Sequence, residues 1–109
     1  VIIDRDAMCE VTRTDRETRW EEVCGKSCPD AVGAALSAIN AEGRPIWKPM
    51  HMQPLYRDFP FVTANGETAR ESVSEDIFAR GYCLPSDNKM SAEQQEVVIE
   101  VIRRCFGGR

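Results

Sequence analysis

The sequence predicts an α+β fold, in which helices cover one face of a small, mainly antiparallel sheet. Apolar residues recur at helical spacing over residues 29–42 and 91–106, and each such stripe needs a surface to bury against. Three short segments, residues 1–5, 44–47 and 82–85, contain the β-branched or aromatic residues that favour strands. Strands and helices arranged in this way pack as layers around one hydrophobic core.

The first part of the chain combines a strand, a charged segment and a helix. Residues 1–4 open with three β-branched side chains and predict the first strand. Residues 5–27 are rich in charge without a lasting period, so we expect a solvated segment with a helical turn around residues 18–23. Pro29 suits the first position of a helix, and Gly43 is placed to end that helix in a left-handed conformation. The apolar stripe of this helix consists of Val32, Ala35, Leu36 and Ile39.

The second part of the chain alternates loops with two further helices. Residues 64–67 have the composition of a turn. A short helix is expected over residues 74–81, with Ser74 as its cap. Ser91 and Gln94 have the spacing of a capping box at the start of the last helix.

Bulk properties restrict the class of protein. At 109 residues the chain is expected to form a single domain, residues 1–109. Its net charge of −4 argues against nucleic acid as an electrostatic partner. No apolar run approaches the roughly 18 residues that a membrane span needs, so no membrane association is expected. Because the chain opens at Val1, inside a β-branched run, we expect it to be a fragment of a longer protein.

The cysteines do not predict a metal site. The five cysteines are odd in number and irregularly spaced, which in a cytosolic protein indicates reduced thiols. Cys24 and Cys28 are close in sequence, but a zinc ion would need two further ligands. The chain has a single histidine, and we therefore expect no metal to be bound.

The most informative segment is a proline-rich loop at residues 44–54, RPIWKPMHMQP. It contains the single His, one of the two Trp and two of the four Met. Each Pro removes a backbone donor and restricts the residue before it, so we expect a stiff, extended loop. Binding residues concentrate on loops that a rigid scaffold holds, and this loop is the predicted functional segment.

Three ordered motifs carry a resemblance to a known family. The loop resembles the Arg-Pro-Leu-Trp-Lys-Pro-Met-His-x-Gln-Pro segment of the DegT/DnrJ/EryC1/StrS sugar aminotransferases. Residues 73–86, VSEDIFARGYCLPS, resemble that family's Ala-x-x-Leu-Phe-x-x-Gly-Leu-Cys-Leu-Pro-Ser run. Residues 90–95, MSAEQQ, are similar to its Met-Thr-x-Glu-Asp-Gln helix start. The resemblance covers roughly residues 40 to 106 and implies the small C-terminal domain of a fold-type-I pyridoxal-phosphate (PLP) enzyme.

The resemblance implies a function for the intact protein. Members transfer an amino group, commonly from glutamate, to a keto group on a nucleotide-linked hexose, and this form of the loop is most similar to that of members acting on UDP-linked 4-keto-6-deoxy amino sugars. Their products feed surface polysaccharide and protein glycosylation. The family implies a cytoplasmic homodimer. PLP and its lysine belong to a large domain absent from this chain, so we expect no catalytic and no cofactor-binding residue here, and an inactive fragment.

His51 has two open interpretations. It is either a half-buried histidine whose ring nitrogen bonds a nearby carbonyl, or a residue at the mouth of the active site that reaches the substrate. The resemblance favours the second interpretation, without a role in proton transfer, because the matching loop lies close to the sugar-nucleotide site. We expect Arg44, Trp47, Lys48 and Met50 to be its neighbours in the substrate-binding pocket.

Structural interpretations also remain open for the predicted neighbours of His51. Lys48 provides either an electrostatic contact to a phosphate or a surface charge. Trp47 either anchors the core, which we favour because Trp buries a large apolar area, or forms a wall against the substrate. Arg44 pairs with a carboxylate such as that of Glu42, or binds a carboxylate or phosphate of the substrate.

Two other kinds of protein remain open. One is a free-standing binding module without catalysis, and the other is a ligand-binding or sensor relative of the same family. A domain cut from a larger enzyme should expose an apolar face that normally meets the large domain. We expect this face to contain Trp47, Met50, Met52 and Leu55; burial of the same side chains in their own core would favour the free-standing module.

Overall fold

The structure, a computed structural model, describes residues 1–62 and 72–107. This part of the chain forms three helices and two small antiparallel sheets, which confirms the predicted α+β class. The helices are α1 (Pro29–Ser37), α2 (Val73–Arg80) and α3 (Ala92–Cys105). The strands are β1 (Val11–Arg13), β2 (Thr18–Trp20), β3 (Arg44–Pro45) and β4 (Tyr82–Cys83), and short 3-10 turns form η1 (Arg5–Ala7), η2 (Met50–Met52) and η3 (Pro54–Tyr56). The turn predicted at residues 64–67 lies outside the described residues.

The predicted sheet is present but short. β3 pairs with β4 in antiparallel orientation. The N-terminal segment pairs with the opposite edge of β4, where the Tyr82 amide donates to the Val1 carbonyl at 2.9 Å. Ile2 faces Gly81 in an isolated antiparallel bridge. The three predicted segments therefore lie side by side, although residues 1–5 form no continuous strand.

Helix α1 is shorter than predicted. It ends at Ser37, so the prediction of a helix through residue 42 is wrong. Asn40 adopts a φ of 57°, and this left-handed residue closes the helix in place of Gly43. Asn tolerates that conformation better than most residues, because its short polar side chain bonds locally. Ile39, the last residue of the predicted stripe, is consequently exposed.

The charged segment before α1 forms a hairpin. β1 and β2 pair in antiparallel orientation, with Val11 opposite Trp20, so the helical turn predicted around residues 18–23 is wrong. Strand pairing depends on a partner elsewhere in the chain and on cross-strand packing, neither of which appears in the local sequence pattern. An ion pair of 2.5 Å between Arg13 and Asp30 fastens the hairpin to the first turn of α1.

Capping boxes begin the other two helices. The predicted box of α3 is confirmed, because the Gln94 amide donates to Ser91 Oγ at 3.2 Å and the Ser91 amide donates to Gln94 Oε1 at 2.9 Å. Helix α2 is capped by Ser72 rather than by the predicted Ser74, since the Glu75 amide donates to Ser72 Oγ at 3.1 Å. The Glu75 carboxylate completes this second box by accepting from the Ser72 amide at 3.0 Å.

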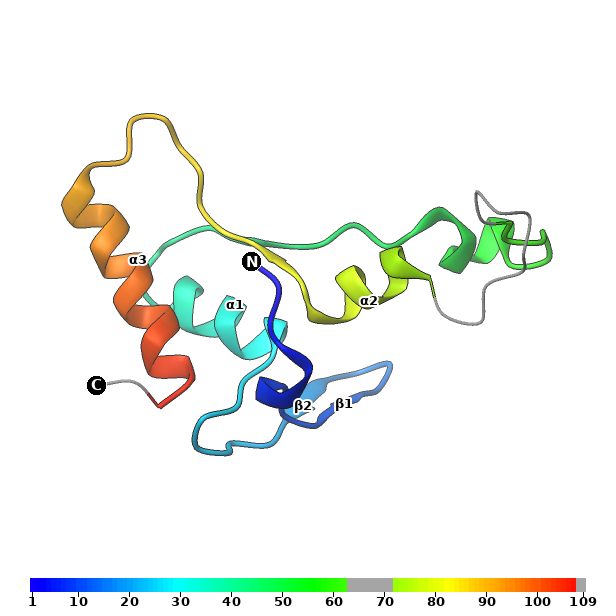
Figure 1. Ribbon diagram of the computed structural model, residues 1–109, viewed down its shortest axis with the longest axis horizontal. Helices are drawn as coiled ribbons and strands as arrows, with labels where there is room; N and C mark the ends of the chain where they lie inside the picture. The colour runs from blue at the N-terminus through cyan, green and yellow to red at the C-terminus, as the bar shows by residue number, and fades with distance from the viewer. Residues whose placement is uncertain (63–71, 108–109) are drawn as a thin grey trace.

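The core lies where α1, α3 and the sheet meet. Its buried members are Ile3, Val32, Leu36, Tyr82 and Val98. Val32 and Leu36 come from the predicted stripe of α1, and Val98 comes from that of α3. Figure 1 shows α3 beside α1 at one end of the molecule, while the loop that follows β3 runs out to the other end along α2. The core thus supports the base of this loop, and the far part of the loop lies away from the core.

Tyr82 determines which residues fit on the facing side of α1. A Cβ added at Gly33 would lie 2.7 Å from the Tyr82 hydroxyl oxygen, and one added at Gly43 would overlap the Tyr82 ring. Real Cβ contacts are never this short, so the buried ring requires glycine at both positions. The close approach allows helix, connection and strand to pack around one aromatic side chain.

Replacing Gly33 with alanine should therefore destabilise the fold. Helix propensity alone would favour alanine by about 1 kcal/mol, whereas the clash with Tyr82 is an overpacking effect that typically costs about 1–3 kcal/mol. We expect a lower thermal unfolding midpoint for Gly33→Ala than for the unmodified chain. The matched control is Ala34→Gly at the neighbouring exposed position, which should lose only the propensity term. A raised midpoint for Gly33→Ala would contradict the packing of Tyr82 described here.

Candidate functional site

The proline-rich loop combines an extended part with two tight turns. Between β3 and Pro49 the chain is extended, as predicted. It then winds into η2 and η3, where the Met52 amide donates to the Pro49 carbonyl and the Tyr56 amide donates to the Gln53 carbonyl, both at 3.0 Å. Proline is compatible with such turns because it precedes or occupies their first position. The prediction of a loop extended throughout is therefore wrong after residue 49.

His51 fastens this loop to helix α2. Its Nε2 lies 3.2 Å from Glu75 Oε1 and 3.5 Å from Ser72 Oγ. Its ring stacks on Phe61 with a centroid distance of 4.0 Å and an interplanar angle of 28°. The side chain is 17% exposed. The histidine is half-buried, as one interpretation expected, but it bonds a carboxylate rather than a carbonyl.

The Glu75 carboxylate is bonded by Ser72 as well as by His51. The Ser72 amide bond is the main cause that lowers the pKa of Glu75, and the His51 bond lowers this pKa further. A carboxylate with a lowered pKa stabilises the fold above its ordinary titration range, and this stabilisation is lost as the pH falls through the lowered pKa. Glu75 is thus ionised at neutral pH and accepts a hydrogen bond from Nε2.

The other predicted site residues lie along the loop, most of them facing solvent. Trp47 is 78% exposed, so the favoured interpretation of Trp47 as a core anchor is wrong. Met50 is also exposed. Arg44 pairs with Glu42, as one interpretation expected. Lys48 is exposed and forms no ion pair within the described part of the chain.

The loop leaves an apolar surface open at its outer side. Trp47, Met50 and Leu55, three of the four predicted members of this surface, are exposed, and Leu55 reaches 76%. Met52, the fourth, is half-buried. The exposed side chains match the expectation for a domain that meets a further layer of protein, because large apolar patches rarely remain in water.

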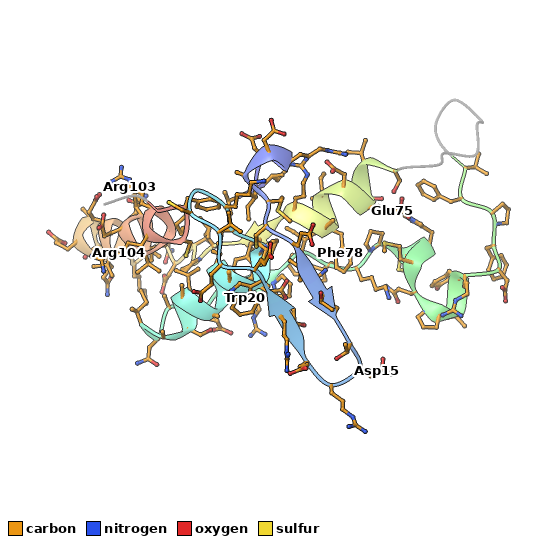
Figure 2. All side chains as sticks on the ribbon, turned by 90° about the horizontal axis from the view of Figure 1, so that it is seen from below. Asp15, Trp20, Glu75, Phe78, Arg103 and Arg104 are labelled. Atoms are coloured by element: carbon orange, nitrogen blue, oxygen red, sulfur yellow. The ribbon has the colours of Figure 1, made fainter. Side chains whose placement is uncertain are left out.

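A groove lies between the hairpin, α1, the loop and α2. It has a volume of about 890 Å³ and a mostly apolar lining. Figure 2 shows Trp20 on the hairpin and Phe78 and Glu75 on α2, which line this groove. Its wall on the side of the loop includes Lys48 and Met52. Of the five predicted substrate-binding residues, Lys48 lines the groove, and His51 adjoins it through Glu75.

Sequence reasoning missed two functional candidates, Glu75 and Trp20. Glu75 could have been found from the spacing Ser72-x-x-Glu75, which is a capping-box signature. Trp20 gave no comparable signal, because its place in the groove depends on the hairpin. Neither residue was assigned a role from the motifs alone.

The comparison with known families decides the assignment. A family profile described as the DegT/DnrJ/EryC1/StrS aminotransferase family matches residues 9–103. The chain belongs to this family. The match includes the loop, α2 and α3 together with the hairpin and α1, so the resemblance predicted for residues 40 to 106 is confirmed and extended.

The chain is similar to a curated aminotransferase. EpsN of Bacillus subtilis (strain 168), which is named as a pyridoxal phosphate-dependent aminotransferase, is 45% identical over 71 residues. The aligned part is 65% of this chain and 18% of EpsN, so the chain spans less than a fifth of that relative. No solved structure matches the chain significantly.

The described residues of this family member do not fit a site for PLP itself. The chain has three lysines, Lys26, Lys48 and Lys89, and all three are exposed. A lysine that forms a Schiff base is activated by a desolvated pocket or by a neighbouring cation, which these positions do not provide. Within residues 1–62 and 72–107, no cluster of His, Cys, Asp or Glu is arranged to hold a metal ion. In the same residues no helix is long and apolar enough to cross a bilayer.

The contact between His51 and Glu75 predicts a measurable shift. In His51→Ala the pKa of Glu75 should rise, because one of the hydrogen bonds that lower it is lost. It should stay below the ordinary glutamate value, because the Ser72 amide bond remains. Carboxyl carbon chemical shifts followed by NMR through a pH titration would measure both effects.

Glu93 is an internal control for this titration. Its pKa is lowered by its own backbone amide and by Ser91 at the start of α3, so His51→Ala should leave it unchanged. An unchanged pKa of Glu75 in the variant would show that the imidazole does not bond this carboxylate in solution.

The exposure of the lysines predicts the outcome of a trapping experiment. PLP mixed with the purified 109-residue chain at low stoichiometry and reduced with borohydride should give no selective label, because all three lysines are exposed to solvent rather than enclosed in a desolvated pocket. Mass spectrometry of the digested chain would locate any adduct. Selective trapping on Lys48 would overturn the assignment of PLP to another part of the protein.

Proposed function

We propose that the intact protein is a PLP-dependent aminotransferase that transfers an amino group from glutamate to the keto group of a nucleotide-linked sugar. The proposed acceptor is a UDP-linked 4-keto-6-deoxy amino sugar, and the product would serve surface polysaccharide synthesis or protein glycosylation. The protein would act as a cytoplasmic homodimer. Family membership and the name of EpsN support the reaction class, and the three motifs support the choice of substrate.

PLP supplies the electron sink for amino-group transfer when it is bound. The phosphate-binding residues, the acid that pairs with its pyridine nitrogen and the lysine that holds it would come from the part of the protein outside this chain. The 109-residue chain would then contribute a rim of the substrate site and no catalytic group. This division of roles accounts for a chain whose lysines are all exposed.

The fastening of the loop to α2 is the observation that carries the proposal. His51 bonds Glu75 at 3.2 Å and stacks on Phe61, so the loop has one defined geometry although its outer side chains face solvent. A loop ordered before binding loses less conformational freedom when the substrate arrives. Such a loop is suited to present Lys48, Met50 and Trp47 to a ligand held by a second domain.

Each predicted residue then has a physical role. Lys48 would contact a phosphate of the nucleotide, since its ammonium group has no carboxylate partner within the described residues. Trp47 and Met50 would pack against the sugar or the second domain. Arg44 would have to release Glu42 before it could bind an anion, so it is the least available of the set. His51 would bond the substrate through Nδ1, which accepts a hydrogen bond when Nε2 carries the proton donated to Glu75.

Kinetics of His51→Ala in the intact enzyme test this proposal. The Michaelis constant for the nucleotide sugar should rise roughly five- to 150-fold, which corresponds to about 1–3 kcal/mol for one lost hydrogen bond. Transfer of the amino group from glutamate to PLP should be nearly unchanged, because that half-reaction needs no sugar. Stopped-flow absorbance of the cofactor measures the two half-reactions separately.

A second variant separates direct contact from fastening of the loop. Glu75→Gln keeps the size of the side chain and removes its charge, so it weakens the fastening while His51 remains. A smaller effect of Glu75→Gln than of His51→Ala indicates direct contact between His51 and the substrate. Loss of the glutamate half-reaction in His51→Ala, with normal binding of the sugar, would show that His51 does not serve the sugar.

A further inference from the structure

The groove between the hairpin and α2 has a role that the proposed function leaves unassigned. Trp20 and Pro29 line it from the side of the hairpin and α1, and Phe78 lines it from α2. These side chains offer flat apolar faces. A ligand pocket of this kind is mostly apolar and uses a small number of polar groups for orientation.

One polar group lies at the floor of the groove. Tyr82 is 7% exposed, and its hydroxyl lies against the position of Gly33, which also lines the groove. Within the described part of the chain the hydroxyl has no hydrogen-bond partner, and no fully buried polar side-chain atom lacks one. The hydroxyl therefore opens toward the groove. Burial raises the pKa of Tyr82, so the phenol stays protonated and can donate a hydrogen bond.

Trp20 is held in place on the opposite wall. Its strand pairs with β1, and the ion pair between Arg13 and Asp30, both of which also line the groove, ties the hairpin to α1. The indole is half-buried and stacks on no other ring among the described residues. A fixed indole with a free face is a stacking surface, because aromatic rings prefer offset or edge-to-face contact with other rings.

The charges along the groove determine the orientation in which a ligand would bind. The carboxylates of Asp30 and Glu75 have partners in Arg13 and His51. Lys48, at the side of the loop, has no ion-pair partner within the described residues. A ligand with a flat uncharged end and an anionic end would therefore place the flat end near Trp20 and Tyr82, and the anion near Lys48.

We propose that this groove is the subsite for the planar base of the nucleotide part of the substrate, with Trp20 as the stacking residue and the Tyr82 hydroxyl as a donor to a carbonyl on the edge of the base. The inference rests on the proposed function, because a nucleotide-linked sugar is the molecule that joins a flat heteroaromatic ring to phosphates. The diphosphate then lies toward Lys48, and the sugar lies toward His51.

A sugar ring fits this groove less well than a base. Each sugar hydroxyl that lies against the apolar part of the groove without a partner loses free energy, and the carboxylates of the lining, Asp30 and Glu75, already contact Arg13 and His51. A base has two apolar faces and a polar edge, which matches the flat side chains of Trp20 and Phe78 and the nearby Tyr82 hydroxyl.

Binding of UDP to the intact protein tests the proposal, with uridine and inorganic pyrophosphate as partial probes, measured by isothermal titration calorimetry. Trp20→Leu should weaken UDP and uridine about tenfold, within the range for loss of one base–aromatic stack, and should leave pyrophosphate unchanged. Trp20→Phe should restore most of the affinity, because it keeps a ring.

Tyr82→Phe should weaken binding of UDP several-fold, because the donor to the base is lost. Tyr56→Phe, a matched change on η3 outside the groove, should have no effect.

Lys48→Met should show the complementary pattern, weakening UDP and pyrophosphate but not uridine, with Lys89→Met as its control. If the intact protein binds UDP and Trp20→Leu binds it equally well, the subsite is wrong while the proposed function stands. If Trp20→Leu keeps its thermal unfolding midpoint and weakens pyrophosphate as much as UDP, the assignment of Trp20 to the base is overturned. If the intact protein binds neither UDP nor another nucleoside diphosphate, the proposed function fails together with the subsite.

Discussion

The close packing of Tyr82 against α1 is the constraint on which the rest of the structure depends. Its backbone joins the N-terminal segment to β3, and its ring fills the space that Gly33 and Gly43 leave free. The sheet is too short to be stable through backbone pairing alone, since isolated short ladders are marginal in water. One buried ring holds helix, connection and strand at a fixed spacing, and this spacing also sets the floor of the groove.

The elements that could be predicted are those whose signal is local. The apolar stripes of α1 and α3 and the capping box of Ser91 and Gln94 involve residues within one or two turns of each other, so their spacing identifies them. The end of α1 was misplaced, because both Asn40 and Gly43 tolerate a left-handed conformation and the sequence does not rank them. The hairpin was not predicted, because the local sequence around Trp20 is equally compatible with a helical turn. Only the pairing of Trp20 with Val11 distinguishes the two.

The residues of the candidate site also divide into those with a local sequence signal and those whose contacts depend on the fold. The motifs identified the loop and His51 without a structure, since their order and spacing are specific to the family. The partner of His51 lies on α2, beyond a stretch of chain whose length gives no information on contact. Trp47 was misjudged for a physical reason: a large apolar side chain predicts burial against something, but the sequence does not say whether its own core or another layer of protein covers it.

The capping box of Ser72 and Glu75 couples the stability of α2 to the position of the loop, because Glu75 also contacts His51. An eight-residue helix has little intrinsic stability in water, and its first turn depends on a carboxylate that also holds His51. Local opening in proteins occurs in cooperative units, so we expect fraying of the helix end to release the loop, because Glu75 contacts both Ser72 and His51. How often the helix end frays would therefore determine how often the loop leaves its single geometry. Hydrogen exchange at the first amides of α2 would report this frequency, although the loop is distant from α2 in sequence.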